Sequence, residues 1–243
     1  DWLRERDQDK PFCLLCHHKA PHRPWYPDEK HAHMYLNETI PEPETLFDDY
    51  SNRAHAAELA MMRVGVHMKA SFDLKAEPPS GLSEEEVRRW AYQRYIKDYL
   101  RVVASVDDNV GRMLDYLDEA GLAETTLVVY TSDQGFFLGD HGWYDKRFMY
   151  EESLRMPFIL RYPREVKPGS VNGDIVTNVD FAPLFLDVAG VPVPDSFQGR
   201  SFRPLLHGET PDDWQTGMYY RYWMNAADHN VSAHYGIRTL RYK

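Results

Sequence analysis

The longest regular pattern in the chain is a helical repeat of apolar residues between Ser83 and Gly121. Glu86 follows Ser83 by three residues, which is the signature of a capping box, and Glu84 and Glu85 suit the positive end of a helix dipole. Gly121 is a typical C-terminal stop. The apolar positions are Val87, Trp90, Ala91, Tyr95, Tyr99, Val102, Val103, Val106, Val110, Met113, Leu114 and Leu117. The pattern predicts one long helix.

Shorter apolar runs on either side of this helix predict strands. Residues 126–130 and 157–160 are runs of strand length, and residues 12–17 form a third. Because the long helix leads directly into the run at 126, the order predicts helix–strand alternation around a mainly parallel sheet. The first of these strands would be buried.

Other segments show weaker patterns. Residues 52–68 and 177–189 carry apolar side chains at helical spacing, and each predicts a helix. Residues 218–223 and 235–240 alternate with a period of two, which predicts two strands of a small antiparallel subdomain.

The end of the predicted strand at 126–130 carries the first candidate chemistry. Asp133 and Gln134 follow the strand, and Gly135 lets the backbone turn sharply. Both side chains present oxygen, which suits Ca²⁺ or Mg²⁺ better than zinc. A simple Asp-Gln-Gly turn is the alternative interpretation.

Lys146 is the second candidate. It lies in a loop rich in Gly, Asp, His and Trp, twelve residues after Gln134. A lysine in a loop is usually solvated, but the aromatic residues around this one predict a loop that packs against a site. A metal-assisted anion site is the interpretation that the whole segment favours.

Composition narrows the possible functions. The 243 residues carry a formal net charge of −10, which argues against a nucleic-acid partner, and 43% are hydrophobic. No run of 18 apolar residues is present, so no membrane-spanning helix is expected. Cys13 and Cys16 form a single CxxC within an apolar run, and we expect two buried strand cysteines rather than a zinc or redox site.

Three motifs give the chain a resemblance to the sulfatases of the alkaline-phosphatase-like superfamily. They are TSDQGFFLGDHGWYDKRFMYEESLRMPFI (131–159), HHKAPHRPWYP (17–27) and HYGIRTLRYK (234–243). The resemblance is closest to the branch of N-acetylglucosamine-6-sulfatases, mucin-desulfating enzymes and iduronate-2-sulfatase-like members. It implies an α/β alkaline-phosphatase-like fold, with a mainly parallel sheet flanked by helices. Residues 1–205 would belong to the catalytic domain and residues 206–243 to a small antiparallel subdomain.

The same resemblance implies roles for particular residues. Asp133 and Gln134 would ligate Ca²⁺ or Mg²⁺ together with two acidic residues from elsewhere in the protein. Lys146 and His22 would hold the sulfate and the leaving oxygen, with His17 and His18 as rivals for the place of His22. In the C-terminal segment, His229, His234 and Arg238 are candidates for sugar recognition, and His234 is the one we assign to substrate binding.

The nucleophile of this family is a formylglycine made from Cys or Ser in a Cys/Ser-x-Pro-x-Arg context. Neither Cys13 nor Cys16 fits that context. The chain is therefore expected to be the C-terminal portion of a sulfatase that acts on a sulfated glycosaminoglycan or mucin glycan, and to be inactive alone. A phosphonate or phosphodiester hydrolase and a non-catalytic carbohydrate-binding relative are the rival functions. The resemblance implies a periplasmic or secreted location.

Overall fold

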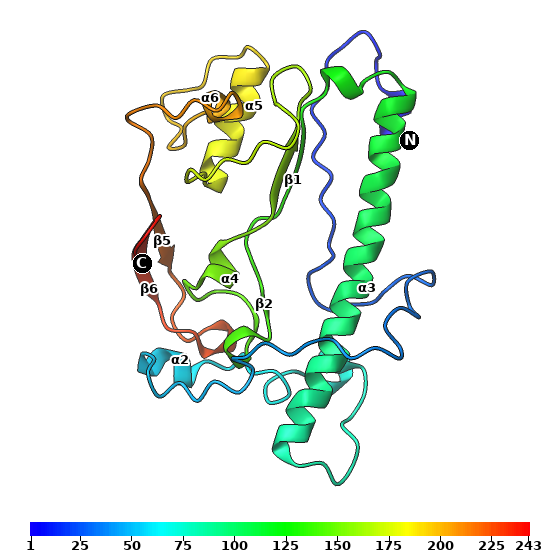
Figure 1. Cartoon of the computed structure of the whole chain (residues 1–243), viewed down its shortest axis with the longest axis vertical. Helices are drawn as coiled ribbons and strands as arrows, with labels where there is room; N and C mark the ends of the chain where they lie inside the picture. The colour runs from blue at the N-terminus through cyan, green and yellow to red at the C-terminus, as the bar shows by residue number, and fades with distance from the viewer.

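The structure is a computed structural model that describes residues 1–243. A single helix, α3 (Glu84–Glu119), runs along one side of the molecule (Figure 1). Ser83 accepts a hydrogen bond from the Glu86 amide while the Glu86 carboxylate accepts one from the Ser83 amide, so the predicted capping box is present. None of the helices is long and apolar enough to cross a bilayer.

The other helices are short. They are α1 (Trp2–Glu5), α2 (His55–Leu59), the π-helix η1 (Ala70–Leu74), the 3-10 helices η2 (Ala123–Thr125), η3 (Asp140–Gly142), η4 (Asn178–Asp180) and η5 (Asp228–Asn230), and the α-helices α4 (Glu151–Leu154), α5 (Phe181–Val188) and α6 (Arg203–Leu206). The helix predicted at 177–189 is thus confirmed as η4 followed by α5.

Six strands form three separate antiparallel pairs. β1 (Val128–Thr131) pairs with β4 (Phe158–Arg161), β2 (Phe137–Leu138) with β3 (Tyr144–Asp145), and β5 (Gly217–Tyr222) with β6 (His234–Thr239). The strands predicted at 126–130, 157–160, 218–223 and 235–240 are confirmed. The mainly parallel sheet is not formed among these residues, because β1 and β4 run antiparallel and the one-turn helix α4 (Glu151–Leu154) between them is too short for the crossover that parallel neighbours need.

Two further predictions fail. Residues 12–17 form no strand, since no other segment of the chain hydrogen-bonds with their backbone, and Cys13 and Cys16 are exposed rather than buried. Only His55–Leu59 of the helix predicted at 52–68 exists. The rest is held by tertiary backbone hydrogen bonds, from Val64 N to Gly142 O and from Tyr144 N to Met62 O, both at 2.9 Å.

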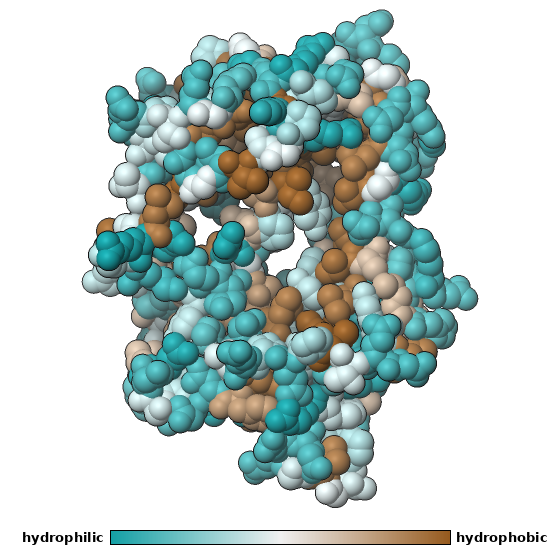
Figure 2. Space-filling model, in the orientation of Figure 1, coloured by the Kyte–Doolittle hydropathy of each residue, from teal (hydrophilic) through white to brown (hydrophobic).

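Three groups of buried side chains hold the molecule together. The largest packs α3 against Trp25, Val64 and Tyr144, and a second surrounds Trp143. The third lies between α5 and α6 around Phe202. The strand β1 is only partly buried, contrary to expectation. Figure 2 shows that this face of the molecule is hollowed in its middle, with hydrophobic side chains along the rim of the opening.

Candidate functional site

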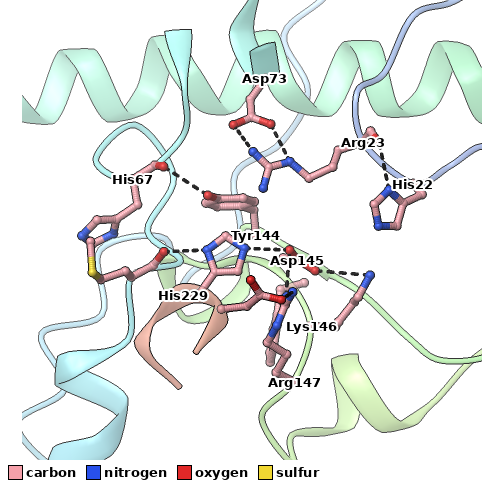
Figure 3. A network of polar contacts seen from close by, with 12 residues as sticks. His22, Arg23, His67, Asp73, Tyr144, Asp145, Lys146, Arg147 and His229 are labelled. Atoms are coloured by element: carbon pink, nitrogen blue, oxygen red, sulfur yellow. Dashed lines mark hydrogen bonds and ion pairs between the residues drawn. The ribbon is translucent and has the colours of Figure 1, made fainter. Parts of the chain in front are cut away.

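A polar network gathers around Asp145 at the end of β3 (Figure 3). The backbone is unusual here, because Asp145 has a φ of 75° and Arg147 a φ of 98° although neither is a glycine. Left-handed backbone at non-glycine residues costs free energy and often occurs at functional sites. Tyr144 fixes the start of the segment, since it is buried and its hydroxyl donates to the carbonyl of His67 at 3.2 Å.

Asp145 is the centre of this network. Its carboxylate is 3% exposed and lies 2.9 Å from Arg147 Nη1, 2.9 Å from His229 Nε2 and 3.6 Å from Lys146 Nζ. Burial alone would raise the pKa of Asp145, but the hydrogen bond with His229 and the charges of Arg147 and Lys146 lower it well below its usual range. Asp145 therefore stays ionised at any pH at which an enzyme works.

Two atoms of this network lack hydrogen-bond partners. Asp145 Oδ1 and Arg147 Nη1 are both buried without one, because the close approach of Nη1 to Asp145 Oδ2 is not aligned as a hydrogen bond. A buried polar atom without a partner costs about 1–3 kcal/mol. A ligand or water that supplied partners would remove that cost.

His229 joins the network from the far end of the sequence. Its Nε2 faces Asp145 Oδ2 and its Nδ1 faces the carbonyl of Met61, each at 2.9 Å. Both neighbours only accept hydrogen bonds, so the doubly protonated ring is the form that satisfies both contacts. Sequence analysis named His229 as a candidate for sugar recognition, and the structure brings it to Lys146 and Asp145.

Lys146 has the environment that the loop composition predicted. Its side chain is 17% exposed, and its ammonium lies 5.9 Å from the centre of the Phe136 ring. The ion pair with Asp145 is long at 3.6 Å, so the ammonium keeps donors for another anion. Lys146 is therefore mostly buried rather than on solvated surface, while its place in a site and its role in catalysis stay predictions.

His22 lies on the same side of the network as Lys146 (Figure 3). It is exposed, and its Nδ1 lies 2.8 Å from the carbonyl of Arg23, which can only accept. Nδ1 thus carries the proton and Nε2 stays available. The rivals His17 and His18 are also exposed. The choice of His22 over them, like its role, stays a prediction.

Asp133 and Gln134 follow β1, and neither makes a hydrogen bond or ion pair with Asp145, Lys146 or His229. Asp133 is exposed, and its carboxylate accepts a hydrogen bond only from the hydroxyl of Ser132, at 3.2 Å. No cationic side chain of the chain is therefore paired with it. Gly135 has no positive φ; it is required because a Cβ there would lie 2.1 Å from the carbonyl oxygen of Glu152.

The chain contains no group of three or more His, Cys, Asp or Glu side chains that could hold a metal ion. Asp133 and Gln134 fit as two hard oxygen donors of a larger shell.

His234 lies in an aromatic cluster rather than in the polar network. Its ring is 5.3 Å from that of Phe148, 5.5 Å from Tyr220 and 5.6 Å from Tyr222. Its Nε2 is buried without a partner, and its Nδ1 meets the carbonyl of Ser232 at 2.9 Å. The structure does not bring His234 together with His22 and Lys146, and its role in substrate binding stays a prediction.

Comparisons with known proteins place these features in a family. Residues 139–243 match the family described as N-sulphoglucosamine sulphohydrolase, C-terminal. An N-acetylglucosamine-6-O-sulfatase of Bacteroides thetaiotaomicron is 44% identical over the whole of this chain, which covers 51% of that protein. A solved structure of a protein in complex with its substrate D-glucosamine-2-N,6-O-disulfate has a TM-score of 0.95 at 44% identity, over 98% of this chain and 57% of that one.

A phosphonate monoester hydrolase from Silicibacter pomeroyi is also similar, with a TM-score of 0.72 at 29% identity, over 87% of this chain and 40% of the other. The chain thus has the fold of alkaline-phosphatase-like enzymes, and it belongs to the sulfatase family. It spans about half the length of the curated relative described above.

Proposed function

We propose that the full-length protein hydrolyses the 6-O-sulfate ester of an N-acetylglucosamine or related glucosamine unit. The observation that supports this most is the likeness, at a TM-score of 0.95 and 44% identity, to a protein described in complex with a glucosamine disulfate. The 44% identity to an N-acetylglucosamine-6-O-sulfatase points to the same sugar and the same position. The sulfated sugar is thus the proposed partner.

The proposed cofactors are a divalent cation, Ca²⁺ or Mg²⁺, and a formylglycine that this chain does not contain. Asp133 and Gln134 would hold the cation together with acidic residues from outside these 243 residues. A bound cation polarises the sulfate and lowers the cost of negative charge on the nucleophile. The exposed carboxylate of Asp133, free of any cationic side chain, supports this assignment.

Lys146 and His22 would act on the sulfate itself. The Lys146 ammonium would neutralise charge that develops on the sulfate and on the leaving sugar oxygen, and its low exposure makes that interaction stronger than in water. The proton on His22 Nδ1 is held by the Arg23 carbonyl, so Nε2 is the atom that would meet the ester oxygen.

Asp145, Arg147 and His229 would bind sugar hydroxyls. Asp145 Oδ1 can accept a hydrogen bond and Arg147 Nη1 can donate one, and both are unsatisfied in the protein alone. A sugar hydroxyl both donates and accepts, so one hydroxyl group can satisfy both atoms. His234 could contact a more distant part of the glycan. The periplasmic or secreted location that the sulfatase resemblance implies is proposed with it.

Parallel assays of the full-length protein test this proposal. With Ca²⁺ present, we expect inorganic sulfate from N-acetylglucosamine-6-sulfate at a kcat/KM at least about 100-fold above that for a phosphonate monoester, a difference of about 2.7 kcal/mol in transition-state stabilisation. The phosphonate substrate is included because a phosphonate monoester hydrolase shares the fold at 29% identity. Preference for the phosphonate would support that rival function, and binding of the sugar without turnover of either substrate would support a carbohydrate-binding protein.

A further inference from the structure

A groove beside His22 is lined by three cationic side chains, one histidine and two apolar residues. Its volume is about 520 Å³, and its lining residues are Lys19, His22, Arg23, Pro24, Lys69 and Phe72. No carboxylate lines it, although the chain as a whole carries a net charge of −10. Concentrating positive charge at one place in an acidic protein favours binding of an anion there.

A buried carboxylate holds two sides of this groove together by hydrogen bonds. Asp73 is 0% exposed, and it accepts a 2.7 Å hydrogen bond from Arg23 Nε on one wall and another of 2.7 Å from the Lys69 backbone amide on the other. Arg23 Nη2 makes a further ion pair with the same carboxylate. Asp73 lies within the π-helix η1. The groove is therefore held by a buried polar contact rather than by flexible surface chains.

The charges that remain free in the groove are Lys19 and Lys69. Arg23 is neutralised by Asp73, whereas both lysine side chains are exposed and meet no carboxylate of the chain. His22 links this groove to the proposed sulfate position, because it lines the groove and also lies on the Lys146 side of the polar network. An anion bound by the two lysines would thus lie beside the sulfate that is cleaved.

We propose that Lys19 and Lys69 bind a second anionic group of the substrate, next to the sulfate ester that is hydrolysed. This inference rests on the proposed function and narrows its substrate class to polyanionic glycans of the glycosaminoglycan kind. The second group is a sulfate on the same sugar ring or the carboxylate of a neighbouring uronic acid, since both chemistries suit two ammonium groups. A glycan with one isolated sulfate leaves both lysines without a partner.

Three substrates of the full-length enzyme test this inference. They are N-acetylglucosamine-6-sulfate, glucosamine-2-N,6-O-disulfate, and the 6-sulfated sugar linked to a uronic acid. We expect the wild type to favour at least one doubly charged substrate by about tenfold in kcat/KM, and the double variant Lys19→Gln, Lys69→Gln to lose that preference, since exposed ion pairs contribute only modestly to binding. The preferred substrate identifies the second group as sulfate or carboxylate. The preference should also weaken at high salt.

The matched control is the double variant Lys10→Gln, Lys167→Gln, which removes two exposed lysines that do not line the groove. It should keep the wild-type preference, and Lys19→Arg, Lys69→Arg should keep it too. Equal losses on all three substrates, or no preference in the wild type, would overturn the inference. If the wild type releases no sulfate from any substrate, the proposed function fails instead. Calorimetric titration with the same sugars then tests the inference, because the ratio of affinities for doubly and singly charged sugars can be measured without turnover.

Discussion

Replacement of Asp133 by alanine in the full-length enzyme is expected to abolish measurable sulfate release and to weaken Ca²⁺ binding. The carboxylate is the only charged one of the two side chains that we assign to the cation at the end of β1, and a hard cation depends on charged oxygen ligands. Loss of an outer-shell partner of a metal typically costs about 10- to 100-fold, so loss of a direct ligand should cost more. Steady-state assays and calorimetric titration with Ca²⁺ measure the two effects separately.

Asp195→Ala is the matched control for this change, because Asp195 is exposed and makes no hydrogen bond or ion pair. That variant should match the wild type in rate and in metal content. If Asp133→Ala also kept near-normal rate and metal content, Asp133-Gln134-Gly135 would be a turn and not part of a metal site.

Lys146→Ala is expected to lower kcat/KM for a sulfate ester by about 100-fold or more, mainly through kcat. The ammonium is 17% exposed and lies 3.6 Å from its nearest carboxylate, so it acts in a partly dry environment on charge that grows in the transition state. Lys167→Ala removes a fully exposed lysine and should change kcat/KM by less than about twofold. Similar small effects at both positions would show that Lys146 does not touch the reacting sulfate.

Local sequence patterns predicted the elements that are stabilised by residues close together in the chain. The capping box at Ser83 and the helical repeat behind it fixed α3, and the period-two runs fixed β5 and β6. Residues 60–64 were misinterpreted because their backbone bonds go to Gly142 and Tyr144, far along the chain. In the structure Ala60, Met62 and Val64 are buried while Met61 is exposed, which is the alternation of an extended segment, but Met61 and Met62 are both apolar and so hide it in the sequence.

The residues of the candidate site also differ in whether local sequence patterns pointed to them. Lys146 and the strand-end pair Asp133-Gln134 were proposed from a continuous motif. Asp145 and Arg147 were overlooked, because a charged residue in a loop is ordinarily solvated and nothing local shows that these two are buried together. His229 was proposed only in general terms, since its contact with Asp145 joins positions 84 residues apart. Contacts over such separations depend on the tertiary fold and leave no periodic signal.

The proposed function divides the work between two groups of residues of the full-length protein. Lys146 and His22 would act on the sulfate, whereas Asp145, Arg147 and His229 would hold the sugar. The claim is tested most directly by assaying Lys146→Ala and Arg147→Lys of the full-length enzyme on N-acetylglucosamine-6-sulfate and on an aryl sulfate that has no sugar hydroxyls. Arg147→Lys keeps a positive charge beside Asp145 but removes the planar donors.

The account predicts that Lys146→Ala lowers kcat/KM for both substrates. It predicts that Arg147→Lys lowers kcat/KM for the sugar sulfate by about tenfold or more, the size expected for a hydrogen bond to a charged group, and leaves the aryl sulfate within about threefold. Equal losses on the two substrates for Arg147→Lys, or a loss confined to the sugar sulfate for Lys146→Ala, would contradict the division of roles.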